Sequence, residues 1–445
     1  MKIFSKRIAI LWTAYSLKDN NGVYHFTRSF LKIAEKNNWK VDIIFDKKSD
    51  IKGQNSYPEL ESLGARLLFP SKPLDDSISK DYYSFTTGVS LIELANLQKG
   101  LLEALQTNLY DLVICEPFFT SIVSQLSSLK IPVMWYTHNP GSVTGEYNDD
   151  NTELFTYIDK ISSNCIIGTQ TEYNQSVLKA RGIDSVVLPL PFPDLEIFKA
   201  TTLPKKGILF CGTTEARKQF DLFFNLIVET KLPAKIMTSK LSGEKMLKQF
   251  KDAGITDVEV RNHILGEEKR DFFASSMIFF TPSTSESFGY ALAEAIPHTN
   301  AVALDYEWTN NFDNNFCHII PKEDYILYIK SLYEVNPPLP QGAMQYVESM
   351  HNNAEIAWAN FINNRTSTIK KFSKGFAETH RNFWLSDLAS LIKRPLLSLD
   401  EINPLLARKD GNALAVTYTD EDTWISLDNI APVEKEKSVL ESLFG

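Results

Sequence analysis

The chain has 445 residues, more than one ordinary hydrophobic core supports, so its length predicts two domains and an appendage. Hydrophobic residues make up 43% and charged residues 23%, as in ordinary globular proteins. The formal net charge of −9 excludes a whole-chain basic footprint for nucleic acid or anionic lipid, so any such contact requires a local basic patch.

The four cysteines are widely spaced and form no CxxC pair, which argues against a disulfide framework or a zinc site. The N-terminal sequence MKIFSKRIAILWTAY contains too short an apolar run for a signal peptide. No other segment approaches the length of a membrane span. We therefore expect a cytoplasmic protein.

Short apolar runs alternate with helical patterns in the first part of the chain. The run RIAILW (7–12) predicts a buried strand, residues 23–36 predict a helix, and KVDIIF (40–45) predicts the next strand. Four more runs of this kind follow, at 111–116, 132–138, 164–169 and 185–190. This alternation predicts an α/β class with a parallel, doubly wound sheet, here an N-terminal Rossmann-like domain over residues 1–200.

A proline-rich stretch, LPLPFPD (188–194), interrupts the pattern and predicts a linker. Strand-like runs then resume at 207–213, 234–239, 257–262, 277–283 and 301–306. We expect a second Rossmann-like domain over residues 201–345 and a cleft between the two domains. A closing helix at 346–364, within a helical segment that starts near 337, and a C-terminal extension at 365–445 complete the predicted organisation.

Two glutamates, Glu286 and Glu294, bracket the tripeptide Phe288-Gly289-Tyr290 directly after the apolar run MIFFTPS. In an open α/β sheet, ligands bind at the carboxyl ends of the strands. A helix start near Phe288 would offer free N–H groups to a phosphate, and Gly289 would allow close backbone approach. Glu286 and Glu294 could then accept hydrogen bonds from two polyols attached to that phosphate. The alternative is that Glu286 is a surface cap and Glu294 an exposed helical charge.

A second strand-to-helix junction, FCGTTEARKQFDLFF (210–224), carries Arg217 and Lys218. Cations do not stabilise the start of a helix, so this pair makes better sense if an anion lies between it and the helix. Arginine offers a bidentate fork and lysine a point charge, both suited to a diphosphate. A solvated basic pair is the alternative.

The stretches around Glu286 and Lys218 resemble those of a known protein family. The stretch LGEEKRDFFASSMIFFTPSTSESFGYALAEAI (265–296) resembles the E-x7-E region of retaining, nucleotide-sugar-dependent glycosyltransferases of the GT-B fold, a family with glycogen and sucrose synthases among its relatives. Further likenesses follow in the family's order over residues 5–364, from the N-terminal glycine loop to the closing helix. The resemblance implies two Rossmann-like domains that face a cleft.

The resemblance also implies roles for individual residues. Glu286 would hold hydroxyls of the donor sugar, Lys218 with Arg217 beside it would stabilise the departing diphosphate, and His138 would lie close to the transferred sugar. The implied donor-binding positions are Gly22, Gly212, Thr213, Phe288, Gly289, Tyr290 and Glu294, with Glu294 at the ribose. The expected donor is a UDP-sugar, and the expected reaction retains configuration and requires no metal or other cofactor.

The chain departs from the family pattern at two places. The family usually has arginine where Thr213 stands, and Arg217 is the residue that could compensate. After Glu294 the family often continues into a small glycine-containing turn, but here Pro297 and His298 follow. Contacts to the base or the acceptor are therefore expected to differ there.

Two features favour DNA as the acceptor. Residues 365–394 carry seven basic and two acidic residues with four aromatic residues interleaved, a composition suited to duplex DNA. The final SVLESLFG, with Leu443 and Phe444, resembles the apolar tails by which phage replication proteins dock on a sliding clamp. A helix packed on the core and a frayed helix end are the respective alternatives.

Domain closure over an extruded base would suit an enzyme that modifies duplex DNA. The sequence therefore favours a hydroxymethylated base in phage DNA as the acceptor, with the protein in the host cytoplasm. The alternatives are a cytoplasmic glycosyltransferase acting on a glycan or a lipid-linked sugar, a non-catalytic GT-B protein that binds a nucleotide sugar or a partner, and an epimerase or phosphorylase on the same fold.

Overall fold

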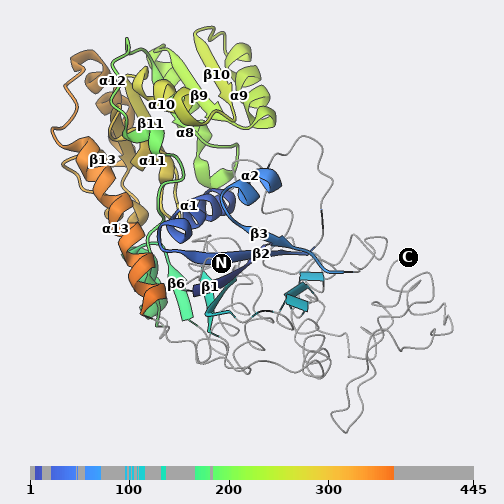
Figure 1. The fold of residues 1–445 in the computed structure, drawn as a ribbon. Coiled ribbons are helices and arrows are strands. Elements are labelled where there is room, and N and C mark those ends of the chain that lie inside the picture. Colours follow the sequence, from blue (N-terminus) through green and yellow to red (C-terminus); the bar gives the residue numbers. More distant parts are fainter. Residues whose placement is uncertain are drawn as a thin grey trace, which may run out of the picture.

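The computed structural model describes residues 6–12, 22–46, 48, 56–71, 96–97, 100–101, 103–104, 108, 110–115, 132–136, 166–180 and 184–364. These residues form two α/β units, each built on one parallel sheet (Figure 1). We call them the N-terminal and the C-terminal unit. The predicted α/β class with two parallel sheets is confirmed.

The sheet of the N-terminal unit has seven strands in the order β3-β2-β1-β4-β5-β6-β7, all paired in parallel. The strands are β1 (Lys6–Trp12), β2 (Trp39–Phe45), β3 (Arg66–Leu68), β4 (Leu112–Cys115), β5 (Val133–Tyr136), β6 (Ile166–Thr169) and β7 (Val186–Val187). The helices described around them are α1 (Gly22–Lys36), α2 (Ser56–Ser62) and α7 (Glu172–Ala180). The central strands are buried on both faces, which explains why they read as continuous apolar runs.

The sheet of the C-terminal unit has six parallel strands in the order β10-β9-β8-β11-β12-β13. The strands are β8 (Ile208–Cys211), β9 (Ala234–Thr238), β10 (Val258–Asn262), β11 (Ile278–Thr281), β12 (Asn300–Leu304) and β13 (His318–Ile320). The helices are α8 (Phe220–Thr230), α9 (Lys240–Asp252), α10 (Gly266–Ala274), α11 (Tyr290–Ala295), α12 (Tyr325–Val335) and α13 (Ala343–Asn363), with 3-10 turns η3 (Leu195–Phe198), η4 (Ala216–Lys218), η5 (Glu307–Asn311) and η6 (Lys322–Asp324). This strand order is that of a Rossmann-type sheet, in which the order reverses beside the first strand.

The structure differs from the predicted elements at β3, β7, β13 and the start of α13. Strands β3 and β13 have three residues each, too few for a period to show in the sequence. The run at 185–190 predicted a strand, but only Val186 and Val187 pair with β6, and Pro189 soon after has no N–H to donate to a ladder. The predicted helix near 337–364 begins only at Ala343, because prolines and the left-handed Gly342 (φ 86°) precede it.

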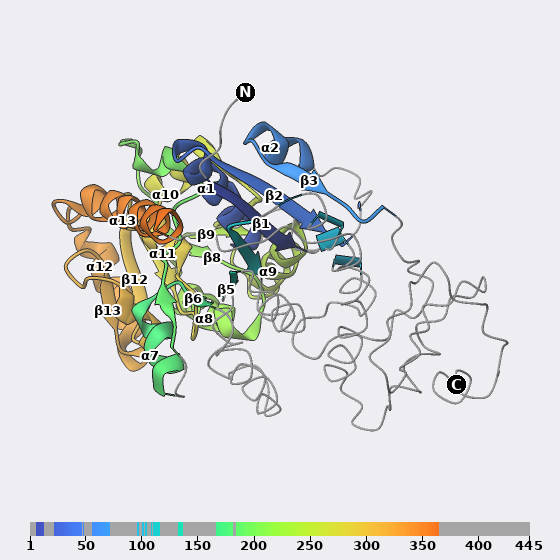
Figure 2. The same ribbon diagram turned by 60° about the horizontal axis from the view of Figure 1, so that its bottom comes forward.

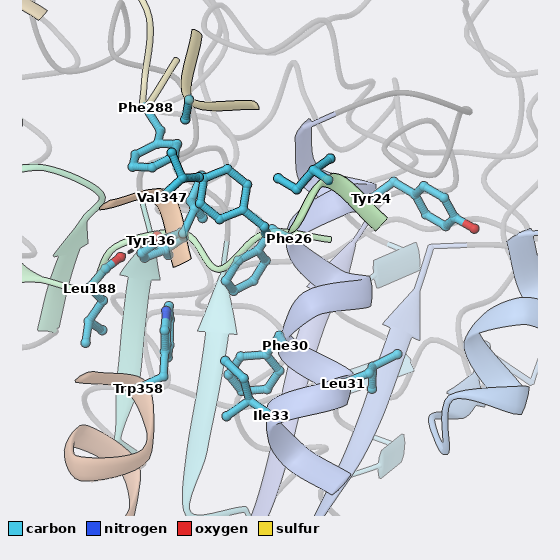
Figure 3. Close-up of a cluster of buried hydrophobic side chains, with 14 of the residues drawn as sticks. Tyr24, Phe26, Phe30, Leu31, Ile33, Tyr136, Leu188, Phe288, Val347 and Trp358 are labelled. Carbon is cyan, nitrogen blue, oxygen red and sulfur yellow. Dashed lines mark hydrogen bonds between the residues drawn. The ribbon is translucent and has the colours of Figure 1, made fainter. Parts of the chain in front are cut away.

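The last described helix, α13, returns from the C-terminal unit and runs along the N-terminal unit (Figures 1 and 2). The Trp358 ring packs against Phe26, Phe30 and Tyr136 at centroid distances of 5.5, 5.2 and 5.2 Å. Its indole N–H donates to the Pro189 carbonyl at 3.0 Å. The end of α13 is therefore held by the core of the unit that comes first in the chain (Figure 3).

One hydrophobic cluster includes residues from both units, with Phe288 and Phe26 among its members (Figure 3). Phe192, in the segment between the units, lies 5.9 Å from Phe288 and 5.7 Å from Tyr290 by ring centroids. The Tyr290 hydroxyl donates to the Pro191 carbonyl at 2.8 Å. The proline-rich segment thus fixes the loop that joins Glu286 to α11. Within the described ranges, no helix is long and apolar enough to cross a membrane.

Candidate active site

Glu286 forms an ion-pair cluster with Arg217 and Lys218. The two cations lie in η4, directly after β8, and Glu286 lies in the loop after β11. Because β8 and β11 are neighbours in a parallel sheet, their carboxyl ends bring these loops together. Lys218 Nζ donates to one oxygen of Glu286, and Arg217 Nη1 lies 3.2 Å from the other.

Backbone contacts hold the same two loops together. The Thr284 N–H donates to the Arg217 carbonyl at 2.8 Å. In the other direction, Arg217 Nη1 donates to the Ser285 carbonyl at 3.3 Å. The cluster is therefore positioned by main-chain hydrogen bonds as well as by charge.

The surroundings of Glu286 keep it ionised. Burial alone raises the pKa of a carboxyl, but Lys218 and Arg217 outweigh burial here and lower the pKa of Glu286 below its ordinary 4.5. The Glu286 side chain keeps 15% of its surface exposed. A carboxylate accepts about four hydrogen bonds. Lys218 and Arg217 each take one of them, which leaves acceptor capacity for a ligand hydroxyl.

Glutamate 294 forms a second pair, with Lys269 of α10. Lys269 Nζ donates to Glu294 Oε1 at 2.6 Å, and the Glu294 side chain is only 2% exposed. Burial dominates here, and despite Lys269 it raises the pKa of Glu294 above 4.5. The alternative of an exposed helical charge at Glu294 is therefore wrong.

The start of α10, and with it Lys269, is held by the segment between the two units. The Gly266 N–H donates to Asp194 Oδ2 at 2.6 Å, and Asp194 Oδ1 accepts from the Glu196 N–H at 3.1 Å. Asp194 thus satisfies one of the backbone donors that a helix start leaves free. A residue of the linker therefore orients the helix that carries Lys269.

Cys211, at the end of β8, feels the charges of both ion pairs. Burial raises the pKa of its thiol to about 11, and the charges that act on it are Lys269, Glu294, Lys218 and Glu286. All four charges are therefore close to one strand end. The two glutamates, eight positions apart in the sequence, therefore both act on the end of β8.

The structure requires glycine at position 289 for a reason other than close approach of the backbone to a phosphate, which the sequence suggested. The φ of Gly289 is +87°, and a Cβ there would lie 2.6 Å from Cζ3 of Trp308. The Trp308 indole N–H in turn donates to the Ser283 carbonyl at 2.8 Å. Only glycine allows this turn to pack on the Trp308 ring. The helix that follows, α11, is short and starts at Tyr290, and the Phe288 side chain is buried.

Two more of the predicted donor-binding residues lie at the end of β8. Gly212 and Thr213 follow β8, and the Gly212 N–H donates to the Met237 carbonyl at 3.1 Å. A Cβ at Gly212 would lie 3.4 Å from Cδ of Lys218, so the glycine adjoins that lysine stem. Gly22 is the first residue of α1. His138, residues 365–394, Leu443 and Phe444 lie outside the described residues.

The sequence did not single out His25 or Lys269. His25 lies in the first turn of α1, three residues after Gly22, and Lys269 is among the charges that act on it. Burial, Lys269 and Arg28 together lower the pKa of His25 to about 3, so its imidazole is neutral. The position of His25 one turn after a predicted glycine loop was the available signal. No sequence signal pointed to Lys269, because its partner Glu294 belongs to another helix.

In the part of the chain that the structure describes, no group of three or more histidine, cysteine, aspartate or glutamate side chains could hold a metal ion. Paired cations suit a diphosphate, and ionised carboxylates suit hydroxyl groups.

No protein-family model and no curated protein matches the sequence. Solved structures do match. HepE of Anabaena, in complex with UDP and glucose, aligns over 80% of this chain and 97% of its own, at 13% identity and a TM-score of 0.56. TarM aligns over 86% of this chain and 99% of its own, at 12% identity and a TM-score of 0.54. AviGT4, a glycosyltransferase involved in avilamycin A biosynthesis, aligns over 80% of this chain and 97% of its own, at 11% identity and a TM-score of 0.51.

These likenesses establish the fold. Together with the two parallel sheets, they show that the chain has the GT-B fold of glycosyltransferases, as the resemblance implied.

Proposed function

We propose that this chain is a retaining glycosyltransferase that moves a sugar from a nucleotide-sugar donor, first of all a UDP-sugar, to a hydroxyl acceptor. The observation that carries the proposal is the ionised Glu286 held by Lys218 and Arg217 where β8 and β11 end. HepE has been crystallised with UDP-glucose, and TarM of S. aureus with UDP, which supports a uridine nucleotide.

The proposed chemistry follows from charge. Cleavage of a sugar–phosphate bond builds negative charge on the leaving diphosphate. Lys218 and Arg217 are fixed cations that stabilise this charge in the transition state. Glu286 accepts hydrogen bonds from the donor sugar, and Glu294 from the ribose. The acceptor attacks the face that the leaving group occupies, and a diphosphate oxygen takes its proton, so no side-chain base is required.

For the acceptor, we propose a hydroxymethylated base in phage DNA. The basic and aromatic composition of residues 365–394 supports this choice. A glycan or a lipid-linked sugar is the competing acceptor, and the pairing of Glu286 with two cations is compatible with either. The two acceptor classes therefore have to be separated by experiment.

The test incubates the full chain with UDP-, GDP- and ADP-sugars and with duplex DNA that contains 5-hydroxymethylcytosine, cytosine duplexes being the control. Mass spectrometry of nucleosides detects an added sugar, and NMR of the product gives its anomeric configuration. We expect a mass gain with retained configuration that Glu286→Gln abolishes. The same change at the exposed Glu229 of α8, Glu229→Gln, should leave the gain intact.

Each other outcome is informative. Transfer to a glycan or lipid-linked acceptor but not to DNA would overturn the DNA proposal alone. An inverted product would overturn retention. Nucleotide-sugar binding without transfer to any acceptor would indicate a non-catalytic binding protein.

A further inference from the structure

Helix α1 presents a polar face to the C-terminal unit. His25 and Lys32 are seven residues apart, so they lie on the same side of the helix. Lys32 Nζ donates to the Pro193 carbonyl of the linker at 2.8 Å. The charge of Lys269, on α10 of the C-terminal unit, acts on His25. Figure 1 shows α1 between the first sheet and the C-terminal unit. Asp194, the next residue of that linker, accepts from the Gly266 N–H at the start of α10, the helix that carries Lys269. This face of α1 is therefore joined through the linker to the helix that forms the Lys269–Glu294 pair.

The His25 side chain is partly exposed, but its Nδ1 atom is buried and has no hydrogen-bond partner among the described residues. A buried polar atom without a partner costs about 1–3 kcal/mol, so such atoms at a ligand site indicate a group that the ligand supplies. The cations beside it, Lys269 and Arg28, disfavour a positively charged partner. A hydroxyl suits this position, because it can donate to Nδ1 or accept from it, whichever tautomer is present.

We infer that His25 is a donor-recognition residue, whose Nδ1 hydrogen-bonds a ribose hydroxyl of the nucleotide that Glu294 and Lys269 hold from the opposite unit. The inference rests on the proposed function. It places the ribose, and not the transferred sugar, at His25 because His25 adjoins the Lys269–Glu294 pair. The nucleotide is then held by both units, and its binding links them.

The test measures nucleotide affinity by titration calorimetry and requires no acceptor. The wild type is titrated with UDP, GDP and ADP, and the tightest of these is compared with its 2′-deoxy and 3′-deoxy forms. We expect His25→Phe, which keeps an aromatic ring without the nitrogen, to weaken the ribonucleotide about tenfold, the usual cost of one good hydrogen bond. One of the two deoxy forms should lose little from the same substitution, because it lacks the hydroxyl concerned.

Two further variants identify the nitrogen and control for folding. The Oδ1 atom of His25→Asn lies near the place of Nδ1, so this variant should recover most of the lost affinity. The amide of His25→Gln lies near the place of Nε2, so this variant should not. Thermal unfolding of each variant reports whether it folds. If His25→Phe does not fold, the comparison of His25→Asn with His25→Gln tests the inference instead.

The outcomes separate the inference from the proposed function. A wild-type chain that binds none of the three nucleotides overturns both. Nucleotide binding that His25→Phe leaves unchanged overturns the inference alone. An equal loss for the ribonucleotide and both deoxy forms shows that His25 does not contact a ribose hydroxyl.

Discussion

Glu286 and Glu294 belong to one site but have opposite electrostatic settings. Glu286 faces two cations and keeps 15% of its side-chain surface exposed, and its pKa is lowered. Glu294 faces one lysine and is 2% exposed, and its pKa is raised. The residue type is the same, so the number of cations and the depth of burial decide which effect dominates.

The difference indicates two kinds of half-site. The Glu286 cluster is charged and accessible, as a group that meets the reacting part of a ligand should be. The Glu294 pair is buried and depends on a single partner, as a pair that supports the structure around a site should be. Four predictions test this distinction, in order of decreasing effect.

The largest effect is expected at Lys218. Lys218→Met removes a cation that would stabilise the leaving diphosphate, so the rate at saturating donor should fall about 100- to 1000-fold. Lys269→Met should change the rate at saturating donor less than tenfold and act mainly on donor affinity. Initial rates over a range of donor concentrations provide the check. Equal losses of rate in both variants would show that the two half-sites do not differ in role.

The second effect is on stability and is expected at Lys269. Lys269→Met leaves the buried Glu294 without its cation and should lower the free energy of unfolding by about 3 kcal/mol. Lys218→Met should cost less, because Glu286 keeps Arg217. Urea unfolding followed by tryptophan fluorescence measures both. The double variant Lys269→Met/Glu294→Gln should recover most of the loss, and no recovery would contradict the pairing.

The third effect involves the turn between the two glutamates. Gly289→Ala places a Cβ against Trp308 in a left-handed conformation and should lower the free energy of unfolding by about 2 kcal/mol. Gly254→Ala is the matched control, since Gly254 also has positive φ (71°) but has no atom within 4 Å of the added Cβ. The difference between the two variants isolates the Trp308 contact. Equal destabilisation would refute that contact.

The smallest effect is the pH dependence of stability, which should have opposite signs at the two carboxyls. The pKa of Glu286 is lowered, so its contribution is present above 4.5 and is lost as pH falls through its folded pKa. The pKa of Glu294 is raised, so its ionisation destabilises the fold as pH rises above 4.5 through its folded pKa. Each unit of separation between folded and unfolded pKa corresponds to about 1.4 kcal/mol.

Urea unfolding of the wild type, Glu286→Gln and Glu294→Gln between pH 3 and 8 measures these slopes. The wild type should gain stability relative to Glu286→Gln as pH rises below 4.5, and lose stability relative to Glu294→Gln as pH rises above it. Slopes of the same sign would remove the distinction between the two carboxyls.

Much of the fold was predictable from local pattern. Runs such as RIAILW and KVDIIF became neighbouring parallel strands, because strands buried on both faces must be apolar throughout. The junction with Lys218 and the loop with Glu286 could be predicted as candidate sites because both follow a strand. Their direct pairing was not predicted, since it depends on which strands are neighbours in the sheet.

The sequence by itself determined where along the chain the principal strands lie, where the first sheet ends and the second begins, and which two loops are candidates for binding a ligand. It did so because strand and turn preferences depend on residues close together in the chain. Only the tertiary structure decided that Lys269 pairs with Glu294, that Trp308 requires glycine at position 289, and that Lys32 of α1 contacts the linker. Each of these contacts joins residues from different elements, so it forms only when packing brings the elements together.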